Sequence, residues 1–324
     1  MENQQMLVKS IKILSAIVLL FITLMVISYV AIGWNDIPFD AAAKSNAPGR
    51  MVSISDGEIH YQWIEPAEEN TNGETVVMSH GYGVPGFMFQ QIAQMLADDG
   101  YKVLIFDHFG HGFSDRPNKP FNSDFFNREV TELLQALEIT EPVILIGQSM
   151  GAMIASNYTV THSKLVKKLV LFVPAGLRMV ESENKGLVNM LATPVLGSWI
   201  WRVFGRAAME EPDPPPCELC GNGKIVGDVY VQAQYEGYFE SMHNILVEYP
   251  MNKQDHVYHD LAKVKVPTLA FFGEQDRLVK PESADLFQLI LPDSSVIVLP
   301  HGDHVLHIRH WNEVGNKVIQ WLHQ

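Results

Sequence analysis

The sequence predicts an α/β fold in which a mostly parallel sheet carries helices on both faces. Short uncharged runs rich in β-branched residues alternate along the chain with segments of helical spacing. Polar and glycine-rich turns follow several of these runs, at the edge where such sheets hold their ligands. The 324 residues suffice for one large domain with an insertion, or for two domains. A net charge of −14 without a basic block argues against a nucleic-acid partner.

The N-terminal region contains a candidate membrane segment. Residues 13–33 carry no charge and are almost wholly apolar. At 1.5 Å per residue they extend about 30 Å, the thickness of a bilayer core. Lys9 and Lys12 precede the segment, which favours an inside N-terminus and an outside body. We therefore expect a single-pass anchor over residues 1–35 and a linker over residues 36–50.

A cleaved signal peptide is the alternative interpretation of this region. The three alanines at residues 41–43 form a small-residue stretch of the kind that precedes signal cleavage. Cleavage would leave a secreted or periplasmic body, but signal-peptide cores are usually shorter than this apolar segment.

The first half of the folded body alternates strands with helices. Asp56-Gly57 is a hairpin turn signal between the first two strands. The predicted strands cover residues 51–54, 58–64, 75–79, 101–106, 143–147 and 165–173, and the predicted helices cover residues 90–99, 127–137 and 152–160.

The pentapeptide Gly147-Gln148-Ser149-Met150-Gly151 joins a buried strand to a helix. A Gly-x-Ser-x-Gly in this context is typical of a nucleophile elbow. The turn is so sharp that the residues two positions before and after the serine nearly touch, which glycine permits because it lacks a Cβ. The turn exposes the Ser149 hydroxyl beyond the sheet. It also places the Met150 N–H at a helix N-terminus, where it can stabilise an oxyanion.

Two later strand ends provide partners for this serine. The strand at residues 267–272 is followed by Gly273-Glu274-Gln275-Asp276, and the strand at 294–299 by Pro300-His301-Gly302-Asp303-His304. Helices are predicted at residues 281–290 and 308–322. A carboxylate followed by a histidine gives the chain order Ser, Asp, His. Asp276 and His304 are the candidates, with Glu274 and His301 as alternatives.

Three motifs in this order resemble those of the α/β-hydrolase family. They are HGYG at residues 80–83, DHFGHGFSDRP at residues 107–117, and the GQSMG elbow. Their order and spacing are similar to the esterase and lipase branch, including monoacylglycerol-lipase-like members with an N-terminal membrane segment. The resemblance covers residues 51–324 apart from a cap, and it implies that the Tyr82 N–H joins the Met150 N–H in an oxyanion hole.

The resemblance also bears on the histidines. It implies that Asp276 and His304 occupy the family's acid and base positions, although Asp303 between Gly302 and His304 departs from the family pattern and keeps His301 open. We interpret residues 107–117 as a structural loop and assign His108 and His111 no chemistry.

Strand–helix alternation stops over residues 178–262, which we expect to form an inserted cap on a core of residues 51–177 and 263–324. The resemblance implies a helical lid over the serine, and the apolar and aromatic residues of this stretch suit an acyl chain. Cys217 and Cys220 lie beside a proline-rich break within it. A local disulfide, free thiols and half of a metal site are all open for this pair.

These observations predict a serine hydrolase that acts on a carboxylic ester, with a small-molecule ester or a lipid such as a monoacylglycerol as substrate. The mechanism requires no metal or organic cofactor. Carbon–carbon bond hydrolases, serine peptidases, thioesterases and acyltransferases of the same fold remain open. Ser149 disfavours the epoxide-hydrolase and dehalogenase branches, which carry aspartate there. Two alternatives do not use the serine as a nucleophile. They are a non-catalytic, membrane-tethered binding module of the same fold and a redox protein built on the two cysteines.

Overall fold

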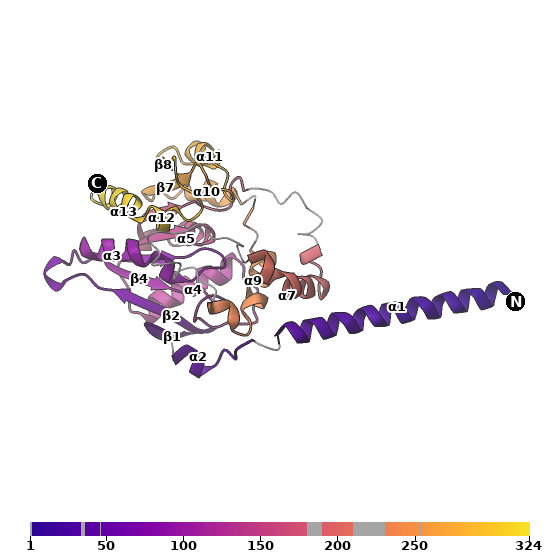
Figure 1. Cartoon of the computed structure of the whole chain (residues 1–324). Coiled ribbons are helices and arrows are strands. Elements are labelled where there is room, and N and C mark those ends of the chain that lie inside the picture. Colours follow the sequence, from indigo (N-terminus) through magenta and orange to yellow (C-terminus); the bar gives the residue numbers. More distant parts are fainter. Residues whose placement is uncertain are drawn as a thin grey trace.

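An eight-stranded sheet organises the body of the chain in the computed structural model (Figure 1). The structure describes residues 2–33, 36–45, 47–179, 190–209, 231–249, 251–252 and 254–324. The strand order is β1-β2-β4-β3-β5-β6-β7-β8, with β1 and β2 antiparallel and the remaining neighbours parallel. The strands are β1 (Arg50–Ile54), β2 (Gly57–Ile64), β3 (Thr75–Ser79), β4 (Lys102–Phe106), β5 (Val143–Gln148), β6 (Val166–Phe172), β7 (Thr268–Gly273) and β8 (Ser295–Leu299).

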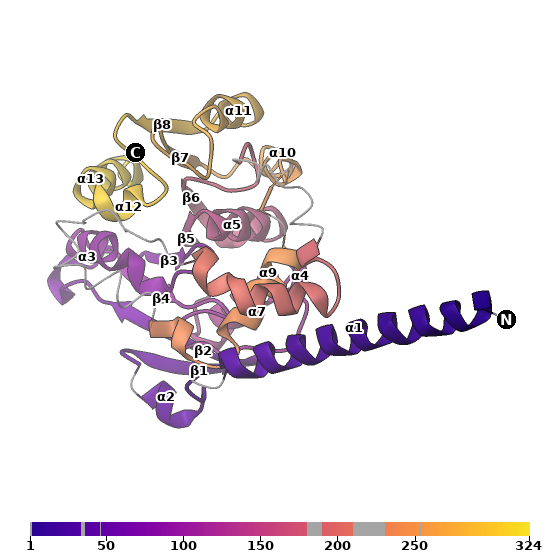
Figure 2. The ribbon, with the colours of Figure 1, turned by 45° about the vertical axis from the view of Figure 1, so that its right-hand side comes forward.

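Helices cover both faces of this sheet. One layer contains α3 (Gln90–Asp98), α12 (Leu306–Arg309) and α13 (Trp311–Leu322). The other contains α4 (Ser123–Ala136), α5 (Met150–Thr161), α10 (His256–Leu261) and α11 (Ser283–Ile290). Figure 2 shows α3 and α13 on one side of the strands and α5 on the other. The short elements are α2 (Ala41–Ser45), η2 (Glu68–Asn70), η3 (Gly86–Phe89) and η4 (Ser163–Leu165). The predicted α/β fold is confirmed.

The central strand β5 explains how both layers are held. All six of its residues are buried. Because side chains alternate across a strand, Ile144 and Ile146 enter the core beneath α3 and α13, whereas Val143 and Leu145 enter the core beneath α4 and α5. An uncharged run is what a strand covered on both faces requires.

Two helix boundaries differ from the predicted ones. Helix α4 begins at Ser123, four residues before the predicted start, because the Asn122 side chain accepts a hydrogen bond of 2.9 Å from the Phe125 N–H. The predicted closing helix is two helices, since the chain breaks at His310 with φ −115° and ψ 30°. Neither change moves a strand.

The predicted cap is described in part. It contains α7 (Leu196–Met209), η5 (Gln232–Gln234) and α9 (Tyr238–Glu248), with α7 packed against α9. Helix α10 falls within the predicted cap range but packs against α5. The division into core and cap remains our proposal. Cys217 and Cys220 lie outside the described residues, and so do the interpretations attached to them.

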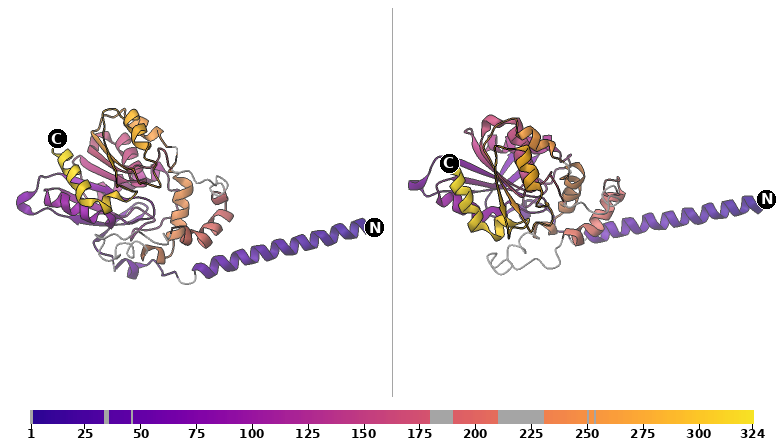
Figure 3. Two further views of the ribbon diagram at one scale, coloured as in Figure 1. Left: turned by 45° about the horizontal axis from the view of Figure 1, so that its top comes forward. Right: turned by 90° about the horizontal axis from the view of Figure 1, so that it is seen from above.

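Helix α1 (Glu2–Ile32) projects from the body in every view (Figures 1 and 3). Its residues Gln4–Ile32 are long and apolar enough to cross a membrane, with a mean hydropathy of 2.7 over the most apolar window. No residue of that window is fully buried against the protein. A membrane anchor and a signal sequence both have this character.

His307 is a core residue that carries an ionisable group. Its ring stacks on Phe172 with a centroid distance of 5.8 Å and an interplanar angle of 6°, and Phe89 packs beside it. Its Nδ1 atom has no hydrogen-bond partner among the described residues. Burial, assisted by the nearby His304, lowers the pKa of His307 from 6.5 to about 3.

We predict that His307→Phe makes folding less sensitive to acid. The unfolded chain binds a proton at position 307 below about pH 6.5, while the folded chain stays neutral there until about pH 3. Wild-type stability is therefore present above the unfolded pKa and falls as the pH drops. Because the variant lacks this group, the free energy of its unfolding should change less steeply with pH. The slope should be smaller by the contribution of one proton, or about 1.4 kcal/mol per pH unit.

Urea unfolding at several pH values between about 4 and 7 measures this slope. The exposed His301 provides the matched control, and His301→Gln should keep the wild-type slope. Parallel stability curves for wild type and His307→Phe would contradict the prediction.

Candidate active site

Ser149 occupies the sharp turn between β5 and α5. Its backbone has φ 52° and ψ −113°, a conformation that residues other than glycine rarely adopt. The Ser149 N–H donates to the Phe172 carbonyl at 3.0 Å, which ties the turn to strand β6. The side chain is 5% exposed.

The flanking glycines are required by close backbone contacts. A Cβ atom at Gly147 would lie 2.5 Å from the Gly151 carbonyl oxygen, and one at Gly151 would lie 2.1 Å from the Ser79 carbonyl oxygen. No side chain fits at either distance. The turn thus has the steric constraint that the sequence pattern predicts for an elbow.

His304 joins Ser149 to Asp276. The His304 ring places Nε2 3.0 Å from the Ser149 Oγ and Nδ1 2.9 Å from Asp276 Oδ2. Asp276 follows β7 and His304 follows β8, so three separate strand ends supply the three groups. The second oxygen of Asp276 accepts hydrogen bonds from the N–H groups of Leu278 and Val279 at 2.7 and 2.9 Å, which fix the carboxylate.

The alternative residues do not reach this cluster. The side chains of Glu274 and His301 are exposed, and His301 contributes its carbonyl oxygen to His310. Asp303 accepts the Val305 N–H at 3.0 Å and forms an ion pair with Arg309. The residue that departs from the family pattern therefore shapes the turn that carries His304.

One predicted oxyanion donor, Met150, belongs to the elbow, and the other, Tyr82, follows β3. Met150 is the first residue of α5, so its N–H has no acceptor within the helix. The Tyr82 N–H has no acceptor among the described residues. Gly81 brings its turn against the elbow, since a Cβ there would lie 2.1 Å from the Gln148 side-chain oxygen.

Two buried histidines support the turn after β3. His80 accepts the His108 N–H at Nε2 over 2.8 Å, and its Nδ1 lies 2.8 Å from the Gly81 carbonyl oxygen. Burial lowers the pKa of His80 to about 3, and neighbouring His108 contributes in the same direction. His111 accepts the Gly83 N–H at 3.0 Å, and burial lowers its pKa as well. Both rings are therefore neutral hydrogen-bonding supports at neutral pH.

The buried carboxylate of Asp107 holds the loop after β4 in place. Burial alone would raise the pKa of Asp107, but the hydrogen bond and charge of His60 hold it well below its usual value. Asp107 also accepts the N–H groups of Gly86 and Phe113 at 2.7 and 2.9 Å. His108 lies between Ser79 and Glu129, at 2.7 and 2.5 Å. These contacts agree with the structural role expected for residues 107–117.

The cap contributes contacts that sequence reasoning missed. Gln232 donates to the Gly83 carbonyl at 2.9 Å and accepts the Gly112 N–H at 2.6 Å, and the Tyr238 hydroxyl donates to the same Gly83 carbonyl at 3.0 Å. The Tyr82 hydroxyl donates to the Met242 carbonyl at 3.0 Å. Between 120 and 160 residues separate these partners, and no local pattern links residues so far apart.

Metal ions need groupings of ligating side chains, which can be sought in the part of the chain that the structure describes. There, no three His, Cys, Asp or Glu side chains converge on a position that could hold a metal ion.

Known proteins resemble this chain over most of its length. Lipase 1 of Psychrobacter immobilis is 26% identical over 267 residues, spanning 81% of this chain and 80% of the relative. A 2-hydroxy-6-oxo-6-(2'-aminophenyl)hexa-2,4-dienoic acid hydrolase of Metapseudomonas resinovorans is 24% identical over 285 residues, spanning 83% and 89%. The crystal structure of a membrane phospholipase A, described as a bacterial virulence factor, superposes with a TM-score of 0.62 at 21% identity. It covers 99% of this chain and 98% of that protein, and at this identity it shows the fold.

The family comparison agrees with the fold and with these relatives. The family model described as serine aminopeptidase, S33, matches residues 71–309. That range includes the elbow, Asp276 and His304. The resemblance to the esterase and lipase branch is thereby confirmed, and the chain is an enzyme of this fold. Since the match covers well over half of the sequence, the chain belongs to the serine aminopeptidase S33 family of α/β-hydrolases.

Proposed function

We propose that this enzyme hydrolyses carboxylic esters of the lipid class, with monoacylglycerol-type esters as candidate substrates, through a covalent acyl-enzyme on Ser149. The observation that carries the proposal is the hydrogen-bonded series from the Ser149 hydroxyl through His304 to Asp276. Three groups of the right chemistry meet at one edge of the sheet with the spacing that proton transfer requires.

In the proposed reaction, His304 Nε2 takes the Ser149 proton as the serine oxygen attacks the ester carbonyl. Asp276 holds the ring with Nδ1 protonated and stabilises the imidazolium that forms. The imidazolium then donates its proton to the leaving alcohol, and the acyl group stays on Ser149. A water molecule, deprotonated by His304, releases the carboxylic acid and restores the serine.

The tetrahedral intermediates carry a negative oxygen that needs hydrogen-bond donors. The N–H groups of Tyr82 and Met150 are the proposed pair. Each such donor contributes on the order of 10²–10³ in rate when it is held in place beforehand. The supports of the Tyr82 turn are His80 and His111 from the body and Gln232 and Tyr238 from the cap.

The preference for lipid esters has two supports besides the triad. Two relatives are named as lipases, at 26% and 24% identity. The chain also carries one helix that is apolar and long enough for a membrane anchor. We propose that α1 is a retained single-pass anchor with the body on the extracytoplasmic side, and a cleaved signal remains the alternative.

Two other substrate classes have specific support. The Metapseudomonas resinovorans relative is named for an oxo acid, not for an ester, which keeps carbon–carbon bond hydrolysis open. The family description names aminopeptidases, which keeps peptide substrates open. The same serine chemistry would serve both, so the acyl-enzyme proposal does not depend on which bond is cleaved.

We predict that Ser149→Ala lowers the hydrolysis of p-nitrophenyl esters by about 10⁴-fold or more, because the nucleophile is removed. Initial rates over a series of acyl lengths measure the effect, and the wild-type optimum separates short-chain esterase from lipase. Ser156→Ala on the following helix α5 is the matched control, since the Ser156 hydroxyl donates to the Ala152 carbonyl within that helix. Activity of Ser149→Ala within about tenfold of wild type would rule out the nucleophile.

We further predict that Gln232→Leu lowers kcat by about tenfold and leaves KM nearly unchanged. The substitution removes the hydrogen bond to Gly83 that holds the Tyr82 turn, together with the bond from Gly112 in the loop after β4. A displaced donor affects the transition state more than substrate binding. Gln234→Leu in the same short helix is the control, because the Gln234 side chain is exposed. A raised KM with an unchanged kcat would instead assign Gln232 to substrate binding.

A further inference from the structure

Helix α1 does not leave the body freely, because cap helix α7 packs along it. Figure 2 shows α7 beside the half of α1 that is nearer to the body. The Trp199 indole N–H donates to the Ser28 hydroxyl at 2.8 Å, and the Trp199 ring meets Phe21 edge-on at 6.4 Å. The cap and the candidate membrane helix are therefore directly connected.

The contacts between the two helices change character along α1. Toward the body, Arg202 donates to the Tyr29 carbonyl at 3.1 Å and pairs with Asp36 and Glu240. Farther from the body, the contacts are apolar. A hollow of about 540 Å³ lies between the helices there, lined chiefly by Ile22, Met25, Val26, Val195 and Trp199.

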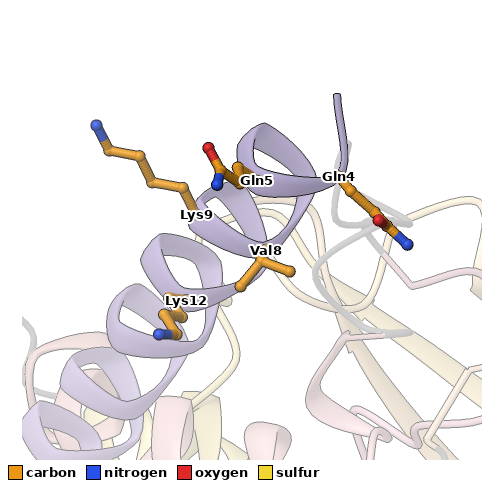
Figure 4. A pocket seen from close by; sticks show the side chains of 5 residues that line it. All are labelled: Gln4, Gln5, Val8, Lys9 and Lys12. Atoms are coloured by element: carbon orange, nitrogen blue, oxygen red, sulfur yellow. The ribbon is translucent and has the colours of Figure 1, made fainter. Parts of the chain in front are cut away.

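The position of α1 in a bilayer follows from its polar end. Lys9 and Lys12 project from its first turns, beside Gln4 and Gln5 (Figure 4). An apolar core of about 30 Å must then use nearly all of the helix beyond Lys12. The body-side end of the apolar segment, at Ile32, lies close to one boundary of the hydrocarbon.

This position determines the depth of the cap contact. Ile22 lies ten residues before Ile32, or about 15 Å along the helix axis. Even a tilt of about 40° leaves roughly 11 Å of depth. The hollow extends along α1 from Ile22 to Val30. Val195 lies about one turn before Trp199, on the side away from Arg202, and would thus lie below the membrane surface.

We infer that the first half of α7 is immersed in the bilayer, so that the cap contacts lipid hydrocarbon directly. The inference rests on the proposed anchor. The hollow between α1 and α7 is then filled by acyl chains of the bilayer that α1 crosses.

The exposure of α7 agrees with this surrounding. Val195, the residue before α7, is 77% exposed although it is large and apolar, and Ser198 in the first turn of α7 is also exposed. Val195 also has φ 66°, which a β-branched residue rarely adopts. Arg202 lies beside the end of α1, at the level where charged groups meet the membrane surface. The Trp199 N–H is satisfied by the Ser28 hydroxyl, as a polar group within the hydrocarbon must be. Polar groups at the boundary and apolar groups below it are what an immersed helix requires.

The consequence concerns the route of the substrate. The same cap carries Gln232 and Tyr238, which hold the turn of the proposed oxyanion hole. A cap immersed at α7 keeps this site at the membrane surface, so an ester with a long acyl chain reaches it from the bilayer.

Depth-dependent fluorescence quenching tests the inference on the full chain in phosphatidylcholine nanodiscs. A fluorophore is attached to Val195→Cys or, as a second position, to Ser198→Cys, which is exposed and lines the hollow in the first turn of α7. Both variants are made in a Cys217→Ser/Cys220→Ser background. Leu19→Cys on α1, 66% exposed, reports insertion of the anchor, and Leu289→Cys on α11, 78% exposed, reports the aqueous body. Quenchers are a lipid with a doxyl group on its acyl chain and aqueous iodide.

We expect the Val195 and Ser198 labels to be quenched by the doxyl lipid, as the Leu19 label is, while the Leu289 label responds to iodide. Labels at Val195 and Ser198 that respond to iodide as Leu289 does, with Leu19 still quenched by lipid, would overturn the inference and leave the anchor intact. A Leu19 label that responds only to iodide would overturn the anchor and the inference together.

Discussion

The backbone contact between Gly151 and Ser79 is the constraint on which the site depends. Only a glycine allows α5 to start so close to β3, and this closeness bends the chain at Ser149 into φ 52°. The parallel pairing of Ser79 with Gly147 sets the register that makes the contact possible. Strain at this turn is sustained because buried strands on both sides determine where it lies.

The turn after β3 shows how the cap and the body act on one element. From the body, His111 accepts the Gly83 N–H, and from the cap, Gln232 and Tyr238 donate to the Gly83 carbonyl. Both backbone polar groups of Gly83, the residue after Tyr82, are thus held, one by the body and the other by the cap. Burial keeps His111 neutral, so that its Nε2 lone pair is available to accept. Movement of the cap would displace this turn directly, because Gln232 and Tyr238 bond to Gly83.

Much of this architecture could be predicted from the sequence, because its signals are local. The uncharged run before Ser149 indicated a strand buried on both faces, and the spacing of Gly147 and Gly151 indicated the sharp turn. The order Ser149, Asp276, His304 followed from reading which residues end parallel strands. The fold and the family are confirmed by the sheet and by the comparisons. The roles of the three residues remain proposals, supported by their geometry.

The features that could not be predicted depend on contacts between distant segments. Gln232 is an ordinary polar residue until the fold brings it to Gly83, and Trp199 is one of several apolar cap residues until it meets Ser28. The early start of α4 depends on a side-chain cap at Asn122, which lies before the helical pattern begins. His307 reads as one more polar loop residue, yet stacking on Phe172 makes it part of the core.

Mapping the adduct of a fluorophosphonate probe tests the central claim most directly. The probe phosphonylates a serine only when a neighbouring base activates it, and the product is stable enough to locate by peptide mass spectrometry. We predict one adduct, on Ser149, which forms in the wild-type chain and is lost in His304→Ala. A chain that hydrolyses esters while Ser149 stays unmodified, or an adduct on another side chain, would contradict it.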